Sequence, residues 1–196
     1  MEERTVRLYT RQNDKTLSQL EREGRIINRR EYVKMHFGDV ADLFLESYDW
    51  FTEEASKRLP KPEDVHAPIW CSISTENCLK PIPGTVVYVL DVPEDRVIYF
   101  DDVKWDYVLN RIYLPENGED EAAYKKHLKD LGVENRFEIL SGKYKGMFPD
   151  EEDRIRESWK RAFEIDEWTV FNVCGNIWEI KKEWVKKIVH PGETIE

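Results

Sequence analysis

The chain has little of what characterises several large classes of protein. Its three cysteines are an odd number without C-x-x-C spacing, and its four histidines are scattered, which argues against a disulfide framework and against a zinc site. No apolar run approaches the roughly 20 residues that span a bilayer, and the charged N-terminus does not resemble a secretory signal peptide. These absences predict a cytoplasmic protein with no membrane segment and no metal.

Glycine-rich phosphate loops and nucleophile motifs are also missing. Neither G-x-G-x-x-G nor the P-loop pattern occurs, and there is no G-x-S-x-G. Ser158 falls inside a helical pattern, which is a poor setting for a nucleophile. No histidine has a visible partner in the sequence, so we interpret all four as surface or capping residues rather than general bases. They are His36, His66, His127 and His190.

Positive charge is in deficit, because 30 Lys and Arg stand against 40 Asp and Glu, for a net charge of −10. Proteins that bind duplex DNA gain much of their affinity by neutralising phosphates with Lys and Arg. The two basic clusters, Arg22–Arg30 and Lys181–Lys187, fall in amphipathic segments, which is typical of solvated faces. We therefore expect no general binding of duplex DNA.

Material for a hydrophobic core is ample. Of 196 residues, 40% are hydrophobic and 12% aromatic, with seven Trp. A chain of this length fits one domain and can bury enough surface to fold without disulfides or metals. We predict a single domain over residues 1–196, with a core from about 6 to 190 and a frayed tail at 191–196.

Apolar periodicity predicts helices and strands in irregular alternation. The clearest helical pattern covers residues 42–59, where apolar residues recur every three or four positions: Phe44, Tyr48, Phe51, Ala55 and Leu59. Further helices are predicted after a capping box at Thr16 and Gln19, after Asp101 or Asp102, and at 121–131, 150–163 and 183–189. Strands are predicted at 6–10, 69–73, 85–92, 96–100, 168–173 and 177–181, with 137–140 as a further candidate.

This order has no regular βαβ period, so it favours an α+β fold over a doubly wound sheet. We expect a mostly antiparallel sheet flanked by helices.

Two strand patterns carry polar residues that need an explanation. Arg7, Tyr9 and Arg11 alternate along the first strand and therefore share one face. Glu179 lies inside the hydrophobic C-terminal strand pattern, where an unpaired charge would be costly to bury. Glu179 either faces solvent or an ion-pair partner on a neighbouring strand, or it is a functional carboxylate in a cleft.

Six short segments together resemble an uncharacterised bacterial family, one of the domains of unknown function. They are Leu8–Thr10, Ser47–Trp50, Pro68–Trp70, Trp105–Asn110, Ser158–Phe163 and Trp178–Ile180. The resemblance spans about residues 6–190. In that family a histidine commonly follows the Trp of the fourth segment, whereas this chain has Asp106, so no role for an imidazole is implied there.

The order of elements also resembles that of mono-ADP-ribosyltransferase-like domains, which use NAD as substrate. The resemblance implies that Glu179 is catalytic and that Arg7 or Tyr9 holds the dinucleotide. A carboxylate can stabilise the oxocarbenium-like ribose that forms when nicotinamide leaves. Arg7 can hold the pyrophosphate, and Tyr9 or Trp105 can stack on nicotinamide.

Two functions follow as expectations. The first is transfer of ADP-ribose to a macromolecular acceptor, protein or nucleic acid, in a toxin or defence system. The alternative is a non-catalytic protein-interaction module of a bacterial or phage system. It is favoured by the acidic charge, the missing phosphate loops and the candidate surface residues Trp50, Trp70 and Trp184. Its partner would be a cognate protein, such as an antitoxin, or a basic surface.

Overall fold

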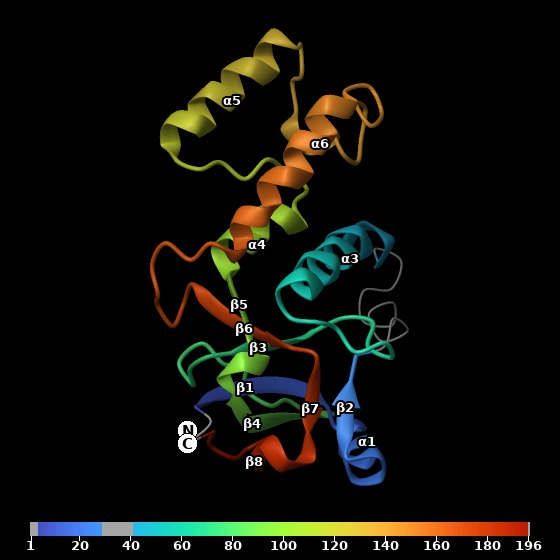
Figure 1. The fold of residues 1–196 in the computed structure, drawn as a ribbon, viewed down its shortest axis with the longest axis vertical. Helices are drawn as coiled ribbons and strands as arrows, with labels where there is room; N and C mark the ends of the chain where they lie inside the picture. Colours follow the sequence, from blue (N-terminus) through green and yellow to red (C-terminus); the bar gives the residue numbers. More distant parts are fainter. Residues whose placement is uncertain (1–3, 29–40, 196) are drawn as a thin grey trace. The chain divides into compact units, whose positions relative to one another are not determined.

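The computed structural model describes residues 4–28 and 41–195 (Figure 1). For residues 41–43 it describes only the backbone. The chain divides into two compact units. We call the first the sheet unit; it comprises the residues up to 100 and those from 167 onward. The second, the helical unit, comprises residues 101–166. His36 lies outside the described residues.

The sheet unit is built on a six-stranded sheet with the order β5-β6-β3-β1-β4-β8. These strands are β1 (Thr5–Asn13), β3 (Ile69–Ser72), β4 (Thr85–Pro93), β5 (Ile98–Asp101), β6 (Val173–Ile177) and β8 (Val185–Val189). A separate two-stranded sheet pairs β2 (Arg25–Ile27) with β7 (Glu179–Lys181). The pairings of β1 with β3 and β4, of β3 with β6, and of β4 with β8 are antiparallel. The predicted α+β fold with a mostly antiparallel sheet is therefore confirmed.

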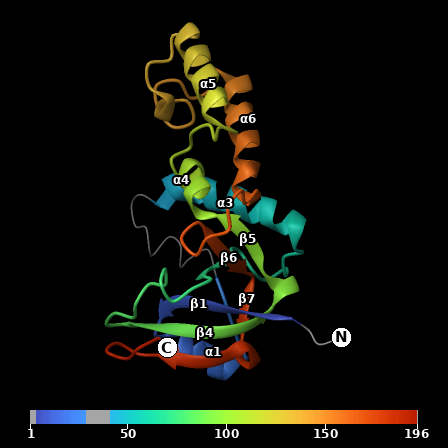
Figure 2. The same cartoon turned by 90° about the vertical axis from the view of Figure 1, so that its left-hand side faces the viewer.

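The long pairing of β1 with β4 sets the two faces of the sheet. Every residue of β1 from Thr5 to Asn13 has a partner on β4 (Figure 2). Because successive side chains in a strand point to opposite faces, Leu8 and Leu90 enter one core, whereas Val87 and Val89 belong to a smaller cluster on the other face. We call these the main core face and the opposite face.

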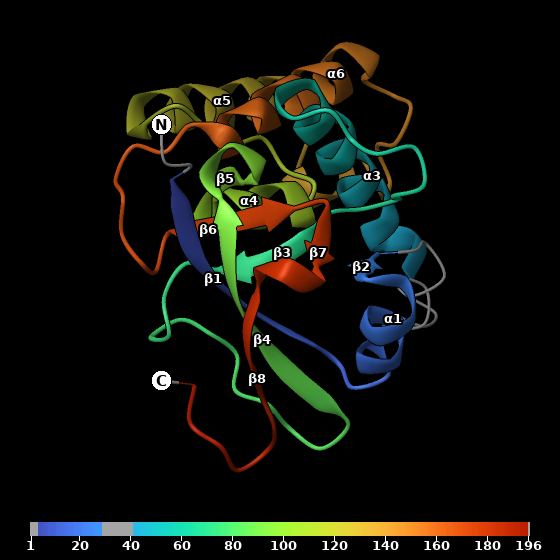
Figure 3. The same cartoon turned by 60° about the horizontal axis from the view of Figure 1, so that its bottom comes forward.

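Helix α1 (Thr16–Glu23) and the β2–β7 pair cover the main core face. Leu20, Ile26 and Ile180 are buried in the same cluster as Leu8, and Figure 3 shows β2 leaving α1 and running toward β7. The helix ends at Gly24, which is left-handed (φ 71°), a conformation that favours glycine. The chain returns to the core just after this glycine, at the buried residues Ile26 and Ile27.

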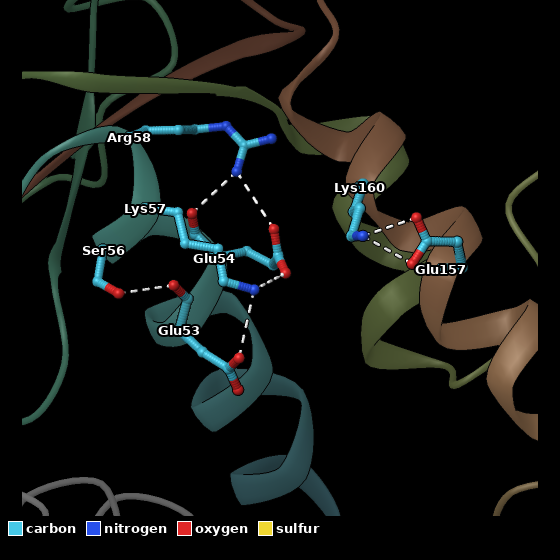
Figure 4. A network of polar contacts seen from close by, with 7 residues as sticks. All are labelled: Glu53, Glu54, Ser56, Lys57, Arg58, Glu157 and Lys160. Atoms are coloured by element: carbon cyan, nitrogen blue, oxygen red, sulfur yellow. Dashed lines mark hydrogen bonds and ion pairs between the residues drawn. The ribbon is translucent and has the colours of Figure 1, made fainter.

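Helix α3 (Ala41–Arg58) confirms the predicted helix over residues 42–59. Phe51 and Ala55 are fully buried. The ring of Phe51 lies 5.1 Å between centroids from Trp70 and 5.1 Å from Phe100, so α3 packs against an aromatic layer on the sheet. At the end of the helix the buried carboxylate of Glu54 contacts two cations, with Lys57 Nζ at 2.6 Å and an Arg58 guanidinium nitrogen at 3.5 Å (Figure 4).

The helical unit contains α4 (Asp102–Leu109), α5 (Gly118–Asp130) and α6 (Pro149–Ser158). Asp101 caps α4, because its carboxylate accepts from the backbone N–H groups of Val103 and Lys104. This confirms one of the two predicted caps. Helix α5 begins three residues earlier than predicted, because the Asn117 side chain accepts from the N–H groups of the first turn. The short 3₁₀ turns of both units are η2 (Glu94–Arg96), η3 (Arg136–Glu138), η4 (Trp159–Phe163) and η5 (Lys182–Trp184).

The predicted strand at 168–173 is wrong. The hydroxyl oxygen of Thr169 accepts from the N–H groups of Phe171 and Asn172, and its carbonyl accepts from Val173 N. A threonine that bonds nearby backbone in this way offers the chain an alternative to a strand ladder. The strand therefore begins only at Val173.

Three other local predictions are also wrong. The predicted helix at 183–189 is η5 followed by β8, whose pairing with β4 and apolar contacts with the main core override the local pattern. The candidate strand at 137–140 overlaps η3. Asn135 caps this turn, because its side-chain oxygen accepts a hydrogen bond from Phe137 N. Thr16 does not form the capping box; its hydroxyl donates to the Asn13 carbonyl at 2.6 Å.

Replacing Phe51 by Ala should lower the free energy of unfolding by about 3–5 kcal/mol, because it removes a fully buried ring from a packed aromatic layer. The matched control is Phe171→Ala, which removes a ring that is 60% exposed and should change stability by about 0.5 kcal/mol or less. Denaturant unfolding monitored by fluorescence measures both. Equal losses in the two variants would contradict the packing of α3 described above.

Asn176 on β6 is a polar core residue whose burial lowers the stability of the fold, so its replacement by Leu should stabilise the protein. Its side chain is fully buried, and neither Nδ2 nor Oδ1 has a hydrogen-bond partner. Leucine has the same branching without polar atoms, so Asn176→Leu should raise the free energy of unfolding by roughly 1–3 kcal/mol. A loss of stability in the same denaturant measurement would show that the amide is satisfied in solution.

Candidate functional site

Glu179 lies on β7, where it is held by cations. Its side chain is 16% exposed, with Arg25 Nη1 at 3.0 Å and Lys181 Nζ at 3.7 Å. Arg25, on the neighbouring strand β2, also pairs with Asp64. The hydrogen bond to Glu179 is the main cause that raises the pKa of Arg25. Of the two interpretations of Glu179, the cross-strand ion pair is the one that this geometry supports.

Arg7 and Tyr9 lie on the opposite face of the sheet, as their alternation predicts. Arg7 forms an ion pair with Asp91, its direct cross-strand partner, and this hydrogen bond raises the pKa of Arg7. Lys186 Nζ lies 3.7 Å from the same carboxylate. Tyr9 packs against the small cluster that contains Val89. Arg7 is thus engaged by a carboxylate, although half of its side chain stays exposed.

The structure does not bring Glu179 to Arg7 and Tyr9. Leu8 and Ile180 are buried in the main core, so their strand neighbours point away from that core on its two sides. Glu179 therefore lies beyond the core on one side, and Arg7 and Tyr9 lie beyond it on the other. The expected convergence on one cleft is not observed.

Trp105, the third residue expected to contact the cofactor, belongs to the helical unit. It lies on α4 and is only 4% exposed. An indole buried to this extent presents little surface to a nicotinamide ring.

A pocket of about 300 Å³ lies within the helical unit, between the end of α5 and the start of α6. Its lining combines apolar and titratable residues: His127, Leu131, Met147, Phe148, Pro149, Asp150 and Glu151. Its volume is at the lower end of the range for small-molecule pockets. We call it the α5–α6 pocket.

The polar wall of this pocket is a histidine–carboxylate pair. His127 Nε2 lies 2.7 Å from Glu151 Oε1. Because an ionised carboxylate can only accept, Nε2 donates, which leaves Nδ1 of a neutral ring as an acceptor. The sequence-based interpretation of His127 as isolated is wrong, because its partner comes from a helix 24 positions further along the chain.

Behind this pair lies a stack of tyrosines. The rings of Tyr113 and Tyr124 are 4.0 Å apart between centroids and nearly parallel, and the Arg154 guanidinium lies over both, at 5.2 and 5.0 Å. Burial, followed by the charge of Glu151, raises the pKa of Tyr124. The Tyr113 hydroxyl donates to Asp120 Oδ2 at 2.9 Å. The stack thus joins Tyr113, in the loop between α4 and α5, to Tyr124 on α5 and Arg154 on α6.

A second candidate surface, in the sheet unit, is aromatic. Trp168 is 58% exposed and Phe171 is 60% exposed. The Trp168 ring meets Tyr99 edge-on, with centroids 4.9 Å apart, and the Thr169 turn fixes the backbone between the two exposed rings. We call this the Trp168–Phe171 surface.

The three tryptophans predicted to lie at the surface are each partly buried. Trp70 packs against Phe51, and Trp184 packs against the main core. Trp50 lies on α3 and is half-buried. None of the three is the exposed anchor that the sequence suggested.

One signal could have pointed to the α5–α6 pocket. Tyr124, His127 and Leu131 recur at the spacing of one helix face within the predicted 121–131 helix. Their carboxylate partner could not be found in this way, because its proximity depends on how α6 returns along α5. Trp168 was misassigned to a strand, which hid its exposure.

Neither a metal site nor a membrane helix is seen in the described part of the chain. There, no three His, Cys, Asp or Glu side chains are grouped so as to hold a metal ion. No helix within the same residues combines the length and apolarity needed to cross a membrane. The expectation that the protein needs no metal stays a prediction.

Comparison with known families matches residues 7–186 to DUF3841, a domain of unknown function. The match covers most of the chain, so the protein belongs to this family. No curated protein and no solved structure matches the chain. The resemblance to a domain of unknown function is thereby confirmed, and nothing in these comparisons supports a resemblance to ADP-ribosyltransferases.

Asp120 should make the stability of the protein depend on pH in the acidic range. Its carboxylate accepts from Glu116 N at 2.9 Å and from the Tyr113 hydroxyl, and the backbone hydrogen bond is the main cause that lowers its pKa. The unfolded state therefore binds a proton more readily than the folded state. The stabilisation is complete above the ordinary Asp pKa of about 3.9 and is lost as the pH falls through the lower pKa of the folded state.

Asp120→Asn should therefore flatten the pH dependence of the free energy of unfolding below about pH 4. Asp130→Asn, which changes an exposed carboxylate at the other end of α5, should leave that slope closer to the wild-type value. Unfolding measured at a series of pH values checks this. A slope in Asp120→Asn equal to that of the wild type would contradict the role given to Asp120.

Proposed function

We propose that this protein is a non-catalytic protein-interaction module that binds its partner through the Trp168–Phe171 surface. The observation that carries the proposal is the exposure of two large aromatic rings, three residues apart, on a backbone fixed by its own hydrogen bonds. Exposed aromatic residues of this kind dominate the binding energy of many interfaces.

The fixed backbone matters because binding costs entropy when loops and side chains must become ordered. The Thr169 turn sets the course of the segment before any partner arrives. Tyr99 supports the Trp168 ring from one side. A preformed aromatic pair therefore loses less freedom on binding than a flexible loop would lose.

The charge of the chain supports a basic partner. Its net charge is −10, and Glu167, next to Trp168, is exposed. Opposite charge on the partner would speed the encounter and favour the correct orientation. The partner that fits best is a protein with an apolar cleft edged by Lys or Arg.

The residues expected to carry out chemistry support the same proposal. Glu179 and Arg7 are both engaged in cross-strand ion pairs, on opposite sides of the main core. ADP-ribosyl transfer from NAD stays a prediction that this arrangement does not favour.

The double variant Trp168→Ala/Phe171→Ala should lose partner binding. Wild-type protein carrying an affinity tag is incubated with an extract of the source organism, and proteins that are retained are quantified by mass spectrometry. The partner is then purified, and its Kd for each variant is measured. We expect at least a 30-fold weaker Kd for the double variant, since the loss of a hot-spot residue costs roughly 2 kcal/mol or more.

The matched control is Leu79→Ala/Ile82→Ala, which removes two other exposed apolar side chains of the sheet unit. It should keep the wild-type Kd within a factor of about three. Equal weakening in both double variants, or a wild-type Kd for the Trp168 and Phe171 variant, would contradict the proposed surface.

A further inference from the structure

We propose that the α5–α6 pocket binds an alkylammonium group, with the cation at the His127–Glu151 pair and the carbon chain against the apolar wall. This site lies within the helical unit and goes beyond the proposed function, because none of its residues belongs to the Trp168–Phe171 surface.

One argument is the charge of the Glu151 carboxylate. Glu151 is only 9% exposed, and a buried carboxylate is costly unless cations compensate it. The nearest arginine nitrogen, Arg154 Nη1, lies 4.0 Å from Oε1, and that guanidinium is also placed over the two tyrosine rings. Glu151 Oε2 is buried without a hydrogen bond of normal geometry, and the Tyr124 hydroxyl, an uncharged donor, interacts with the same carboxylate.

Another buried glutamate in the described part of the chain shows what full compensation looks like. Glu54 is 6% exposed, but Lys57 lies 2.6 Å from one of its oxygens and Arg58 contacts the other (Figure 4). Glu151, by contrast, has a single arginine at the longer distance of 4.0 Å, together with a histidine. An added cation would therefore complete the surroundings of Glu151, whereas Glu54 needs none.

The charged side chains that line the pocket include two carboxylates. Asp150 and Glu151 both line it, so an anionic ligand would meet two like charges. Both residues stand in the first turn of α6. When Nε2 donates to Glu151 and the ring is uncharged, Nδ1 of His127 is an acceptor, which suits a ligand that donates hydrogen bonds.

The rest of the lining of the pocket is apolar. Leu131, Met147, Phe148 and Pro149 supply apolar surface beside the charged groups. A short carbon chain would remove this surface from water, which favours its binding. Phe148 can also attract a cation through its ring face. A cation on a short aliphatic chain matches both parts of the lining, whereas a bare metal ion would leave the apolar part unused.

Titration with n-butylammonium chloride at constant ionic strength tests the site. The signals of the His127 ring and the Met147 methyl group, followed by NMR, should shift saturably with the wild-type protein. The neutral analogue 1-butanol should produce at least tenfold weaker binding, because it lacks the charge that faces Glu151.

Glu151→Gln keeps the shape of the side chain and an oxygen for His127 but removes the charge; it should weaken n-butylammonium at least tenfold. Asp153→Asn is the matched control, because it removes an 85% exposed carboxylate from the same helix, and its affinity should stay within a factor of two of the wild type. If Glu151→Gln does not fold, the comparison of n-butylammonium with 1-butanol on the wild type still decides.

A second arm distinguishes a free amine from a lysine side chain of a protein. Nα-acetyl-lysine methylamide carries the same ammonium on a peptide. Tighter binding of this compound than of n-butylammonium would support a lysine of a partner protein, and weaker binding would support a small amine. Equal affinity for 1-butanol and n-butylammonium, or an unchanged affinity in Glu151→Gln, would overturn the proposal.

Discussion

The antiparallel pairing of β1 with β4 is the constraint on which the sheet unit depends. The register runs without interruption from Thr5↔Pro93 to Asn13↔Thr85, so the alternation of side chains is fixed along the whole length of both strands. A slip of one residue would exchange the two faces. The apolar side chains on one face pack against α1 and the β2–β7 pair. Because of this packing, the main core separates Glu179 from Arg7.

Charge is used in two ways in this protein. In the sheet unit, Arg7 with Asp91 and Arg25 with Glu179 are cross-strand pairs on partly exposed positions, where ion pairs secure register and contribute little to stability. In the helical unit, the Glu151 carboxylate is buried beside a pocket and a histidine. The residues that the sequence pattern marks as reactive are thus engaged in ion pairs, whereas the buried carboxylate beside a pocket lies where the sequence shows no motif.

The sequence predicts those parts of the fold that depend on local pattern. Spacing and side-chain chemistry predict the helix that carries Phe51, the buried strand at 85–92 and the cap at Asp101. All three are observed. The errors occur where tertiary contacts decide. Val185–Val189 is a strand because β4 offers it an edge, and the Thr169 turn replaces the first part of a strand. The His127–Glu151 pair could not be predicted, because it requires the packing of two helices that are separate in sequence.

We propose that Glu179 serves as an ion-pair partner of Arg25 and not as the carboxylate of an NAD site. The most direct measurement is incubation of the purified protein with labelled NAD and an extract of the source organism, followed by separation of protein, RNA and DNA. The wild type and Glu179→Gln should give the same background label in every fraction. Label that appears with the wild type, disappears with Glu179→Gln and persists with the neighbouring control Glu183→Gln would contradict the claim.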